Sequence, residues 1–450
     1  MTSGRRTARS LAAVAVVGTL ALTGCSSSDE EAPTGAASPV TQAEIDEALS
    51  TPTTLDLWAW VPDIQNEVDL FEEKYPDIDV NIINQGGATQ QYVKLRAAIK
   101  AGKGVPDVAQ IGYDRIPSFT QTKDLLDLTP YGAEDVADQF VDGIWSQVEQ
   151  NGGIWAIPQD SGPMGTLYRT DIFEAAGVAA PTTWEEFATA AETIKSATGS
   201  YITNLPGNDM PQMLGFFSQA GAEPFGYDGE ETVTIDVDNN TTQQVVQYWQ
   251  DLIQADLVAT DPDYTDGWYQ GLSRGSYASW LTAAWGPTFL QGTAENTSGL
   301  WSAVELPQWE AGDTISANWG GSANSVMAAS DNPIAAYELA KFINTDAEST
   351  LKLANEQFLF PTTKATLEDP AFTEQASEFY GGQQVNKFFA EVSATVPQNQ
   401  QWLPFMDYVN TAYDDTLGKA IADGGDMVGA LSEWQTKIVD YATSQGFTVQ

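Results

Sequence analysis

The sequence of 450 residues has no histidine and only one cysteine, Cys25. Without histidine there can be no Ser-His-Asp triad, no Cys-His pair and no zinc site with imidazole ligands. Basic residues are also scarce, because 19 Lys and Arg face 62 Asp and Glu, for a formal net charge of −43. Nucleic acid binding needs clustered Lys or Arg, so we predict no nucleic acid partner.

A hydrophobic run long enough to cross a membrane is missing too. The run from Leu11 to Leu22 is far shorter than the roughly 20 residues that a spanning helix needs. Three Arg precede it, and small residues followed by Cys25 end it, which resembles a secretory signal with a bacterial lipobox. We therefore predict a signal peptide over 1–24 and lipidation of Cys25. The protein is predicted to lie on the outer face of the bacterial cytoplasmic membrane, where only the lipid anchor holds it.

The next segment, residues 25–50, is rich in Ser, Ala, Pro and Glu and is predicted to be a flexible tether in which 44–49 could form a short helix. Beyond it, strands are expected at 54–60, 78–82 and 107–112, with helices at 63–74 and 90–101 between them. This β-α-β-α-β order predicts an α/β fold with a mostly parallel sheet. Ligands of such sheets bind beyond the carboxyl ends of the strands, where this chain has Trp58, Trp60, Asn84, Gln85, Tyr113 and Asp114.

The rest of the chain continues the α/β pattern. Strands are expected at 152–157 and 164–169 around a polar turn over 158–163, and Thr183 to Glu186 is a capping box that begins a helix. Further helices are expected near 241–256, 333–344, 348–355, 403–421 and 425–443.

Several short motifs suggest catalysis or metal binding but do not support it. Gly271 to Gly275 matches G-x-S-x-G, yet there is no histidine to act as base. Asp236 to Asn240 starts like a calcium loop but has Thr241 where the loop needs glycine, so a helix-capping turn is the better interpretation. No Walker or dinucleotide motif is present, and we predict no cofactor and no metal. Paired carboxylates of a glycosidase stay open, because the chain has 62 acids.

Tryptophan is the informative residue type. Six Trp lie beside Gly, Pro or Asn or at strand ends, where a ligand could reach them: Trp58, Trp60, Trp155, Trp285, Trp319 and Trp402. Flat aromatic rings stack on sugar rings, and neighbouring polar groups such as Gln159 and Asp160 can bond hydroxyls. Any one Trp could equally be a core residue, and Asp160 could be a turn residue. Together they favour a sugar-binding cleft.

Longer stretches are similar to one family. They are Leu55 to Trp58, Lys103 to Gln110, Leu125 to Pro130, Ile157 to Met164, Pro181 to Phe187, Trp319 to Ser322, Ala335 to Ile343 and Leu359 to Thr362. In order and spacing they resemble the extracellular solute-binding lipoproteins of ABC importers, in the carbohydrate-binding family that includes maltose-binding protein. The resemblance covers about residue 52 to the C-terminus.

The resemblance implies a periplasmic-binding-protein-like fold of two α/β lobes joined by a hinge, with the ligand cleft between them. The first lobe would comprise 51–158 and 314–380, and the second 159–313 and 381–450. Trp58, Trp60, Tyr113 and Asp114 would line the first lobe and Asp160 the hinge, while Trp285, Trp319, Gly320, Gly321 and Trp402 would complete the cleft. The implied partners are a neutral oligosaccharide and the transmembrane subunits of an ABC permease, and the protein is expected to be a monomer and not an enzyme.

Two other functions stay open at this point. A lipid-anchored carbohydrate hydrolase would need two positioned carboxylates, which sequence alone cannot exclude in so acidic a chain. A binder of a polyamine or peptide is compatible with the charge, although the Trp residues favour a sugar.

Overall fold

The computed structural model describes residues 38–398 and 400–450. The strands are β1 (Thr53–Trp58), β2 (Ile78–Ile83), β3 (Val108–Gly112), β4 (Glu149–Gln150), β5 (Gly153–Ile154), β6 (Ile157–Arg169), β7 (Phe225–Tyr227), β8 (Thr232–Ile235), β9 (Ser279–Ala283), β10 (Trp301–Val304), β11 (Asn318–Val326) and β12 (Thr448–Val449). The short 3-10 helices are η1 (Tyr113–Arg115), η2 (Thr129–Tyr131), η3 (Ala133–Gln139), η4 (Glu295–Thr297) and η5 (Glu378–Tyr380).

The α-helices lie between these strands along most of the chain. They are α1 (Gln42–Leu49), α2 (Gln65–Lys74), α3 (Ala88–Ala101), α4 (Ile116–Gln121), α5 (Asp142–Trp145), α6 (Thr170–Ala176), α7 (Trp184–Thr198), α8 (Met210–Gln219), α9 (Asn240–Gln254), α10 (Asp266–Arg274), α11 (Gly286–Thr293), α12 (Pro333–Thr345), α13 (Ala347–Asn355), α14 (Lys364–Glu368), α15 (Pro370–Thr373), α16 (Val385–Ser393), α17 (Met406–Asp415), α18 (Leu417–Asp423) and α19 (Met427–Ser444).

The parallel β-α-β-α-β unit predicted from the sequence is confirmed in β1 to β3. β1 pairs in parallel with β2 on one side and with β3 on the other. The apolar residues of β1 and α2 drive this arrangement, since Leu55, Leu57, Val68 and Phe71 are fully buried. α3 ends at Gly102, whose left-handed backbone (φ +63°) closes the helix where glycine carries no Cβ penalty.

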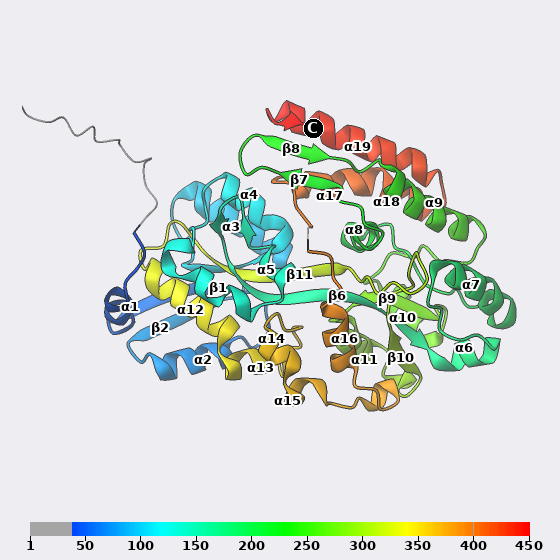
Figure 1. The fold of residues 1–450 in the computed structure, drawn as a ribbon, viewed down its shortest axis with the longest axis horizontal. Helices are drawn as coiled ribbons and strands as arrows, with labels where there is room; N and C mark the ends of the chain where they lie inside the picture. The colour runs from blue at the N-terminus through cyan, green and yellow to red at the C-terminus, as the bar shows by residue number, and fades with distance from the viewer. Residues whose placement is uncertain (1–37, 399) are drawn as a thin grey trace, which may run out of the picture. The chain divides into compact units, whose positions relative to one another are not determined.

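Two antiparallel strands, β6 and β11, connect the half of the fold around β1 to β3 with the half around α7 to α9 and α17 to α19. We call them the crossing strands. The first part of β6 pairs with β11, which pairs in turn with β3, whereas the second part of β6 pairs with β9 and β10. Among the described strands, one seven-stranded sheet therefore runs through both halves (Figure 1).

The polar turn predicted over 158–163 is wrong, because β6 continues through it as a single strand of 13 residues. Pro158 and Pro163 are tolerated there since the pairing with β11 is itself irregular. The register shifts between Asn318 and Gly321 and again between Ser322 and Ala323.

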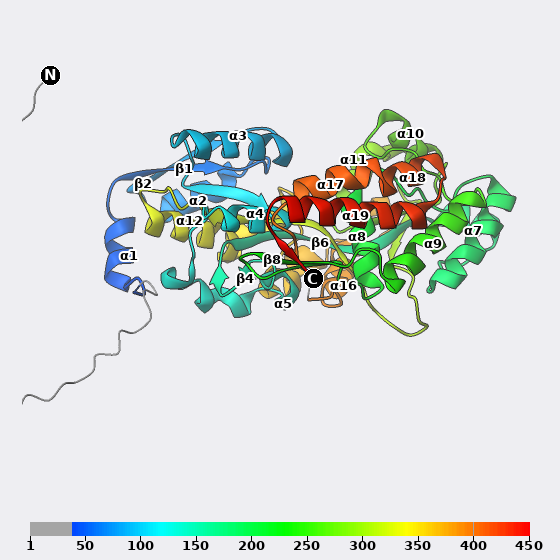
Figure 2. The ribbon, with the colours of Figure 1, turned by 90° about the horizontal axis from the view of Figure 1, so that it is seen from above.

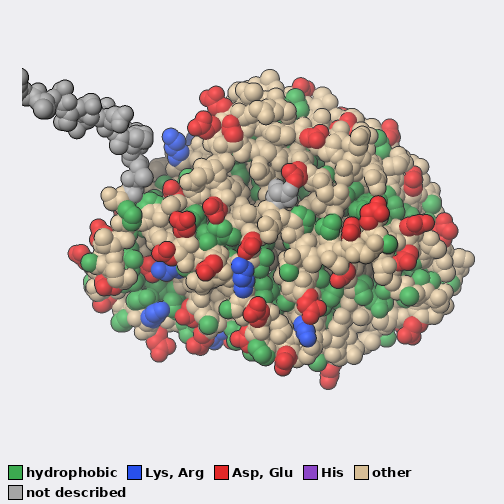
Figure 3. Space-filling view, viewed as in Figure 1, with side chains coloured by type: hydrophobic (Ala, Val, Ile, Leu, Met, Phe, Trp, Pro, Cys, Tyr) green, Lys and Arg blue, Asp and Glu red, His purple; other side chains and the backbone are tan. Residues whose placement is uncertain are grey.

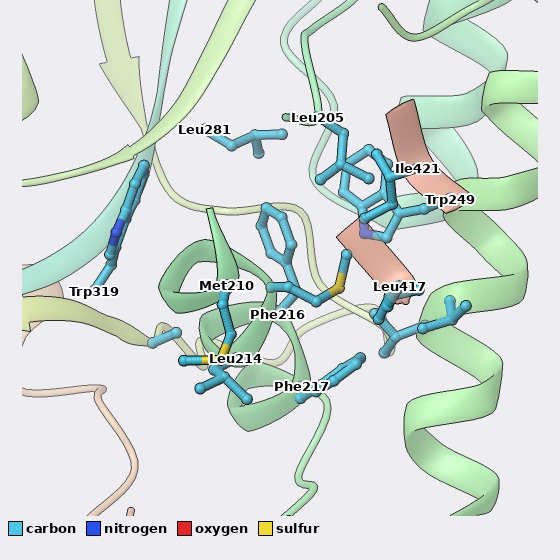
Figure 4. Close-up of a cluster of buried hydrophobic side chains, with 14 of the residues drawn as sticks. Leu205, Met210, Leu214, Phe216, Phe217, Trp249, Leu281, Trp319, Leu417 and Ile421 are labelled. Carbon is cyan, nitrogen blue, oxygen red and sulfur yellow. The ribbon is translucent and has the colours of Figure 1, made fainter. Parts of the chain in front are cut away.

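Within the described residues, hydrophobic side chains form three clusters. The first packs around β1 to β3, the second around α7 to α9 and α17 to α19, and the third around β9, β10, α11 and α16. Figure 4 shows the second cluster, in which Leu214, Phe216 and Trp249 are surrounded by other apolar side chains and Trp319 lies at one edge. The first two clusters are thus the cores of the two halves of the fold, and the third packs against the second part of β6.

Two helix signals read from the sequence have the structure expected. Asn239 in the predicted capping turn accepts hydrogen bonds from the backbone N–H groups of Thr241 and Thr242 at the start of α9. The G-x-S-x-G sequence lies mainly in α10 and not on the strand-to-helix turn that a serine hydrolase requires.

The last part of the segment predicted to be a tether contains helix α1. Thr41 and Glu44 form a capping box at its start, and Leu49 is buried. The helix packs on α12 (Figure 2). Across residues 38–398 and 400–450, none of the helices is both long and apolar enough to span a bilayer.

The acidic composition is visible on the surface. Figure 3 shows Asp and Glu side chains spread over one face of the molecule, with few Lys or Arg among them. A few acids are instead buried, and Glu67 in α2 is the most deeply buried of them: it is fully inaccessible, and neither of its carboxyl oxygens has a hydrogen-bond partner. Burial raises the pKa of Glu67 to about 7.

Replacing this buried acid, Glu67→Gln, is expected to stabilise the protein above pH 7 and to have little effect below pH 4.5. As the pH rises from 4.5 to about 7, the unfolded chain loses the Glu67 proton before the folded chain does, so the native state is progressively destabilised. The variant lacks this penalty, which we put at about 2–3 kcal/mol at pH 8. Urea denaturation at pH 4.5 and pH 8 measures it.

The matched control is Glu73→Gln, because Glu73 is an exposed acid on the same helix. Its effect should stay within about 0.5 kcal/mol at both pH values. Equal effects of Glu67→Gln at the two pH values would contradict the prediction.

Candidate functional site

The candidate site lies where the crossing strands meet β3, and a chain of hydrogen bonds fixes its centre. Gln110 of β3 accepts a bond from the backbone N–H of Trp60 (3.0 Å) and donates one to Ser322 Oγ of β11 (2.9 Å). Ser322 Oγ in turn donates to the carboxylate of Asp160 on β6. The Tyr113 hydroxyl donates to the Asp160 carbonyl oxygen (2.9 Å). Residues far apart in sequence are thus held rigidly together.

Gly321 allows β11 to lie close to Tyr113 and to the backbone of Asp160. Its backbone is left-handed (φ +103°), and a Cβ atom there would lie 2.7 Å from the Tyr113 ring and 2.8 Å from the Asp160 carbonyl oxygen. The preceding Gly320 is also left-handed (φ +85°) and is exposed. The two glycines therefore let β11 pass directly against η1 and β6.

Trp285 and Trp319 form an aromatic pair beside these glycines. Their rings meet edge to face with centroids 4.9 Å apart, and Trp285 Nε1 donates to the Trp319 carbonyl oxygen (3.3 Å). Trp319 is only 5% exposed and belongs to the second core, whereas Trp285 is partly exposed. Trp319 thus fixes the orientation of Trp285, which can present ring surface to a ligand.

Trp60 occupies a comparable position on the other half of the fold. It is partly exposed, and its ring meets Tyr92 of α3 edge to face at 6.0 Å. The Tyr92 hydroxyl accepts a bond from the backbone N–H of Gly112 (2.8 Å), so the support of Trp60 is itself tied to the end of β3.

A charged cluster connects the two halves next to Tyr113. Arg115 lies 3.1 Å from the Asp114 carboxylate and 3.3 Å from that of Asp407, at the start of α17, and Arg96 lies 3.5 Å from Asp407. Burial raises the pKa of Asp114, and the Arg115 guanidinium opposes that rise. Burial also raises the pKa of Asp160 to about 6, with the hydrogen bonds from Ser322 acting the other way. The Asp160 carboxylate therefore stays mostly ionised at neutral pH and can accept hydrogen bonds.

The structure brings most of the residues predicted from the sequence into these contacts. They are Trp60, Tyr113, Asp114, Asp160, Trp285, Trp319, Gly320 and Gly321.

The remaining predicted residues make other contacts. Trp58 is 6% exposed and packs in the first core, and Gln159 is buried on the opposite face of β6, bonded to Asn324. Asn84 and Gln85 lie in a loop, where Asn84 Oδ1 accepts from the Gly86 N–H and the Gln85 carbonyl accepts from Lys94. Trp402 is 9% exposed and donates to Gln147 (2.8 Å). Cys25 lies outside the described residues.

Four residues of the site are absent from the set predicted from the sequence: Gln110, Ser322, Arg115 and Asp407. A signal existed for Gln110, because an amide inside a fully buried strand needs polar partners. Ser322 ends the Trp-Gly-Gly-Ser stretch but has nothing unusual in its local sequence. Asp407 comes close to Arg115 only through the tertiary fold, so sequence patterns could not identify it.

Residues 58–349 match the family model described as bacterial extracellular solute-binding protein. The chain is a bacterial extracellular solute-binding protein. The resemblance noted from the sequence motifs is therefore confirmed at the level of the family.

Several relatives of this solute-binding protein have a sugar in their name. It is 27% identical, over 354 residues covering 75% of this chain and 76% of the relative, to an arabinooligosaccharide-binding protein of Halalkalibacterium halodurans. A solved ABC-transporter-associated binding protein of B. animalis subsp. lactis, in complex with β-1,6-galactobiose, is 32% identical. The structural alignment has a TM-score of 0.76 and covers 88% of this chain and 99% of that protein.

A second solved structure supports the same fold. The galacto-N-biose-/lacto-N-biose I-binding protein of Bifidobacterium longum, in complex with lacto-N-biose, is 25% identical with a TM-score of 0.78. The alignment covers 88% of this chain and 98% of that one. The predicted fold class, an α/β periplasmic-binding-protein-like fold, is confirmed by these similarities.

Proposed function

We propose that this protein captures a neutral oligosaccharide for an ABC sugar importer and delivers it to the membrane permease. The observation that carries the proposal is the set of contacts that connects two partly exposed Trp residues to the crossing strands: Trp60 through Gln110 and Ser322 to the Asp160 carboxylate, and Trp285 through Trp319 of β11. Rings would stack on the sugar, and carboxylates would bond its hydroxyls. The sugar ligands in the names of relatives support the same class of ligand.

The mechanism we propose is hinged closure of two lobes around the sugar. The first lobe would comprise 51–158 and 314–380 and the second 159–313 and 381–450, so that Trp60 and Trp285 come from opposite lobes. A ligand that contacts both lobes favours the closed form by its differential affinity for that form. The contacts of Arg96 and Arg115 with Asp407 already join the two halves on the same side as Asp114.

The proposal extends to the protein's place in the cell. A signal peptide (1–24) would be removed, Cys25 would carry a lipid, and the following residues would keep a monomeric binder near the transmembrane subunits, which raises its effective concentration there. Mass spectrometry of the membrane-bound protein is expected to find a lipidated N-terminal Cys25, and Cys25→Ser should release the protein. A soluble protein with an unmodified Cys25 would show that the predicted lipid anchor is wrong, and the proposed binding function would not be affected.

The experiment that tests the function is a ligand screen of the purified protein. Melting temperature and intrinsic Trp fluorescence are recorded against neutral oligosaccharides that include arabinooligosaccharides, β-1,6-galactobiose and lacto-N-biose. A ligand at 100 times its Kd should stabilise the protein by about 2.7 kcal/mol. If no oligosaccharide of the panel changes the melting temperature or the fluorescence, or if only spermidine or peptides do so, the proposal is wrong.

We also propose that the protein has no catalytic activity. Chromatography of the oligosaccharide after long incubation tests this part, and the ligand is expected to be recovered intact. Slow loss of the added glycan would instead favour a carbohydrate hydrolase that uses a pair of carboxylates.

A further inference from the structure

A large polar cavity lies beside the candidate site. It has a volume of about 420 Å³ and lies between α11, the end of α13, residues 372–378 and the start of α16. Its size lies in the lower part of the roughly 300–1,000 Å³ that is usual for ligand pockets. Most of the apolar wall belongs to the third core, which contains Ala354, Phe360, Phe372 and Val385, whereas Leu359 packs against the first core.

Two short connections join this cavity to the candidate site. Trp285 directly precedes α11, and its neighbours Ala284 and Pro287 line the cavity. On the opposite wall, Gln357 is adjacent to Phe358 and donates a hydrogen bond to the Asp63 carbonyl oxygen (3.2 Å), in the segment that follows Trp60. The cavity therefore borders the segment that carries Trp285, and the residue before Phe358 contacts the segment that follows Trp60.

Phe358 is the unusual residue of the cavity wall. Its side chain is 56% exposed, which makes it one of few large apolar side chains that the described part of the chain leaves open to solvent. Its backbone is left-handed (φ +59°), a conformation that bulky residues disfavour. Strain of this kind is concentrated at functional sites, where the surrounding structure maintains it. An exposed aromatic ring next to a cavity is what a stacking platform requires.

The other lining groups suit a neutral, hydroxylated ligand. Thr288, Gln291, Asn355, Gln375, Ser377 and Asn386 contribute hydroxyl and amide groups. Among the described residues that line the cavity, Glu378 is the one charged side chain, so an anionic ligand would be repelled and a cation would meet a single carboxylate. Amides and hydroxyls both donate and accept, as the hydroxyls of a sugar require.

We propose that this cavity is an extension of the candidate site that holds further sugar units of an oligosaccharide, with Phe358 as the stacking platform. The inference rests on the proposed sugar-binding function and adds a length preference to it. Every ligand places sugar units at Trp60 and Trp285, and only longer ligands reach Phe358.

The test compares ligands of increasing length on the purified protein. Isothermal titration is carried out with arabinooligosaccharides of two to five units and with β-1,6-linked galactooligosaccharides of the same lengths. Phe358→Ala is expected to weaken the binding of the longer members by about tenfold and to change that of the disaccharides by less than about twofold. Gln291→Ala should show the same length dependence, and Phe358→Tyr, which keeps the ring, should restore the affinity for long ligands.

Two further variants separate binding from folding. Phe358→Gly removes the ring but suits the left-handed backbone, so it should lose long-ligand affinity while its melting temperature does not fall. Ile315→Ala removes another exposed apolar side chain, 40% exposed and outside this cavity, and should leave affinity unchanged at every length.

The outcomes separate the two proposals. If Phe358→Ala and Gln291→Ala leave all lengths unchanged while Trp285→Ala abolishes binding, the extension is wrong and the sugar-binding function stands. If the Phe358 variant weakens all lengths equally, the length preference is overturned as well. If the unaltered protein binds no member of either series or of the wider panel, the proposed function fails and the extension fails with it.

Discussion

Replacing Trp285 with alanine is expected to weaken oligosaccharide binding by about 100-fold, the loss found at a central aromatic anchor of a binding site. The indole is held in one orientation before the ligand arrives, because its edge packs on Trp319 and its N–H is bonded to the Trp319 carbonyl oxygen. A fixed ring loses little conformational entropy when it stacks on a sugar. Titration calorimetry with whichever oligosaccharide gives the strongest response in the screen measures the effect.

Trp309→Ala is the matched control for this variant. Trp309 is also partly exposed and also packs against another tryptophan, Trp184, with ring centroids 5.8 Å apart, but it makes no contact with the candidate site. Both variants remove an indole and should lower the melting temperature by similar amounts, whereas only Trp285→Ala should lower affinity. Equal affinities of the two variants would show that Trp285 is a packing residue and would remove it from the site.

The fold was largely predictable from the sequence because its elements are encoded locally. The alternation in β1 and β2, the apolar face of α2 and the glycine after α3 each specify an element within a few residues of chain. β6 was missed for an equally physical reason. Two prolines and a polar stretch normally indicate a turn, but here β11 supplies an irregular partner that tolerates them.

The candidate site was predictable only in part. Trp60 and Tyr113 could be found because they follow strand ends, and in such folds these positions face the ligand. Asp160 was found from the polar stretch 158–163 and the family resemblance, although that stretch is part of β6 and not a turn. Trp58 and Gln159 show the limit of that argument, since a neighbouring position on a strand points to the opposite face and is buried. Gln110 and Asp407 come close to the site through pairings more than 40 residues away in sequence, which no local pattern contains.

The largest effect on the fold at the site is expected from Gly321→Ala. The added methyl group would lie 2.7 Å from the Tyr113 ring and 2.8 Å from a backbone carbonyl oxygen on β6, and the backbone at φ +103° is unfavourable for alanine. Overpacking and backbone strain together should destabilise the protein by about 2–5 kcal/mol. Because Tyr113 and Asp160 must move, oligosaccharide affinity should fall as well.

Gly312→Ala is the control that separates backbone strain from the steric clash expected in Gly321→Ala. Gly312 also has a left-handed backbone (φ +95°) but lies in an exposed loop, and a Cβ atom there would meet nothing within 4 Å. This control should cost about 1 kcal/mol from strain alone and leave affinity unchanged. The difference between the two variants in urea denaturation therefore reports the contact of β11 with Tyr113 and Asp160. If the two variants were equally stable and bound sugar equally well, the crossing strands would not need the close approach on which the proposed site depends.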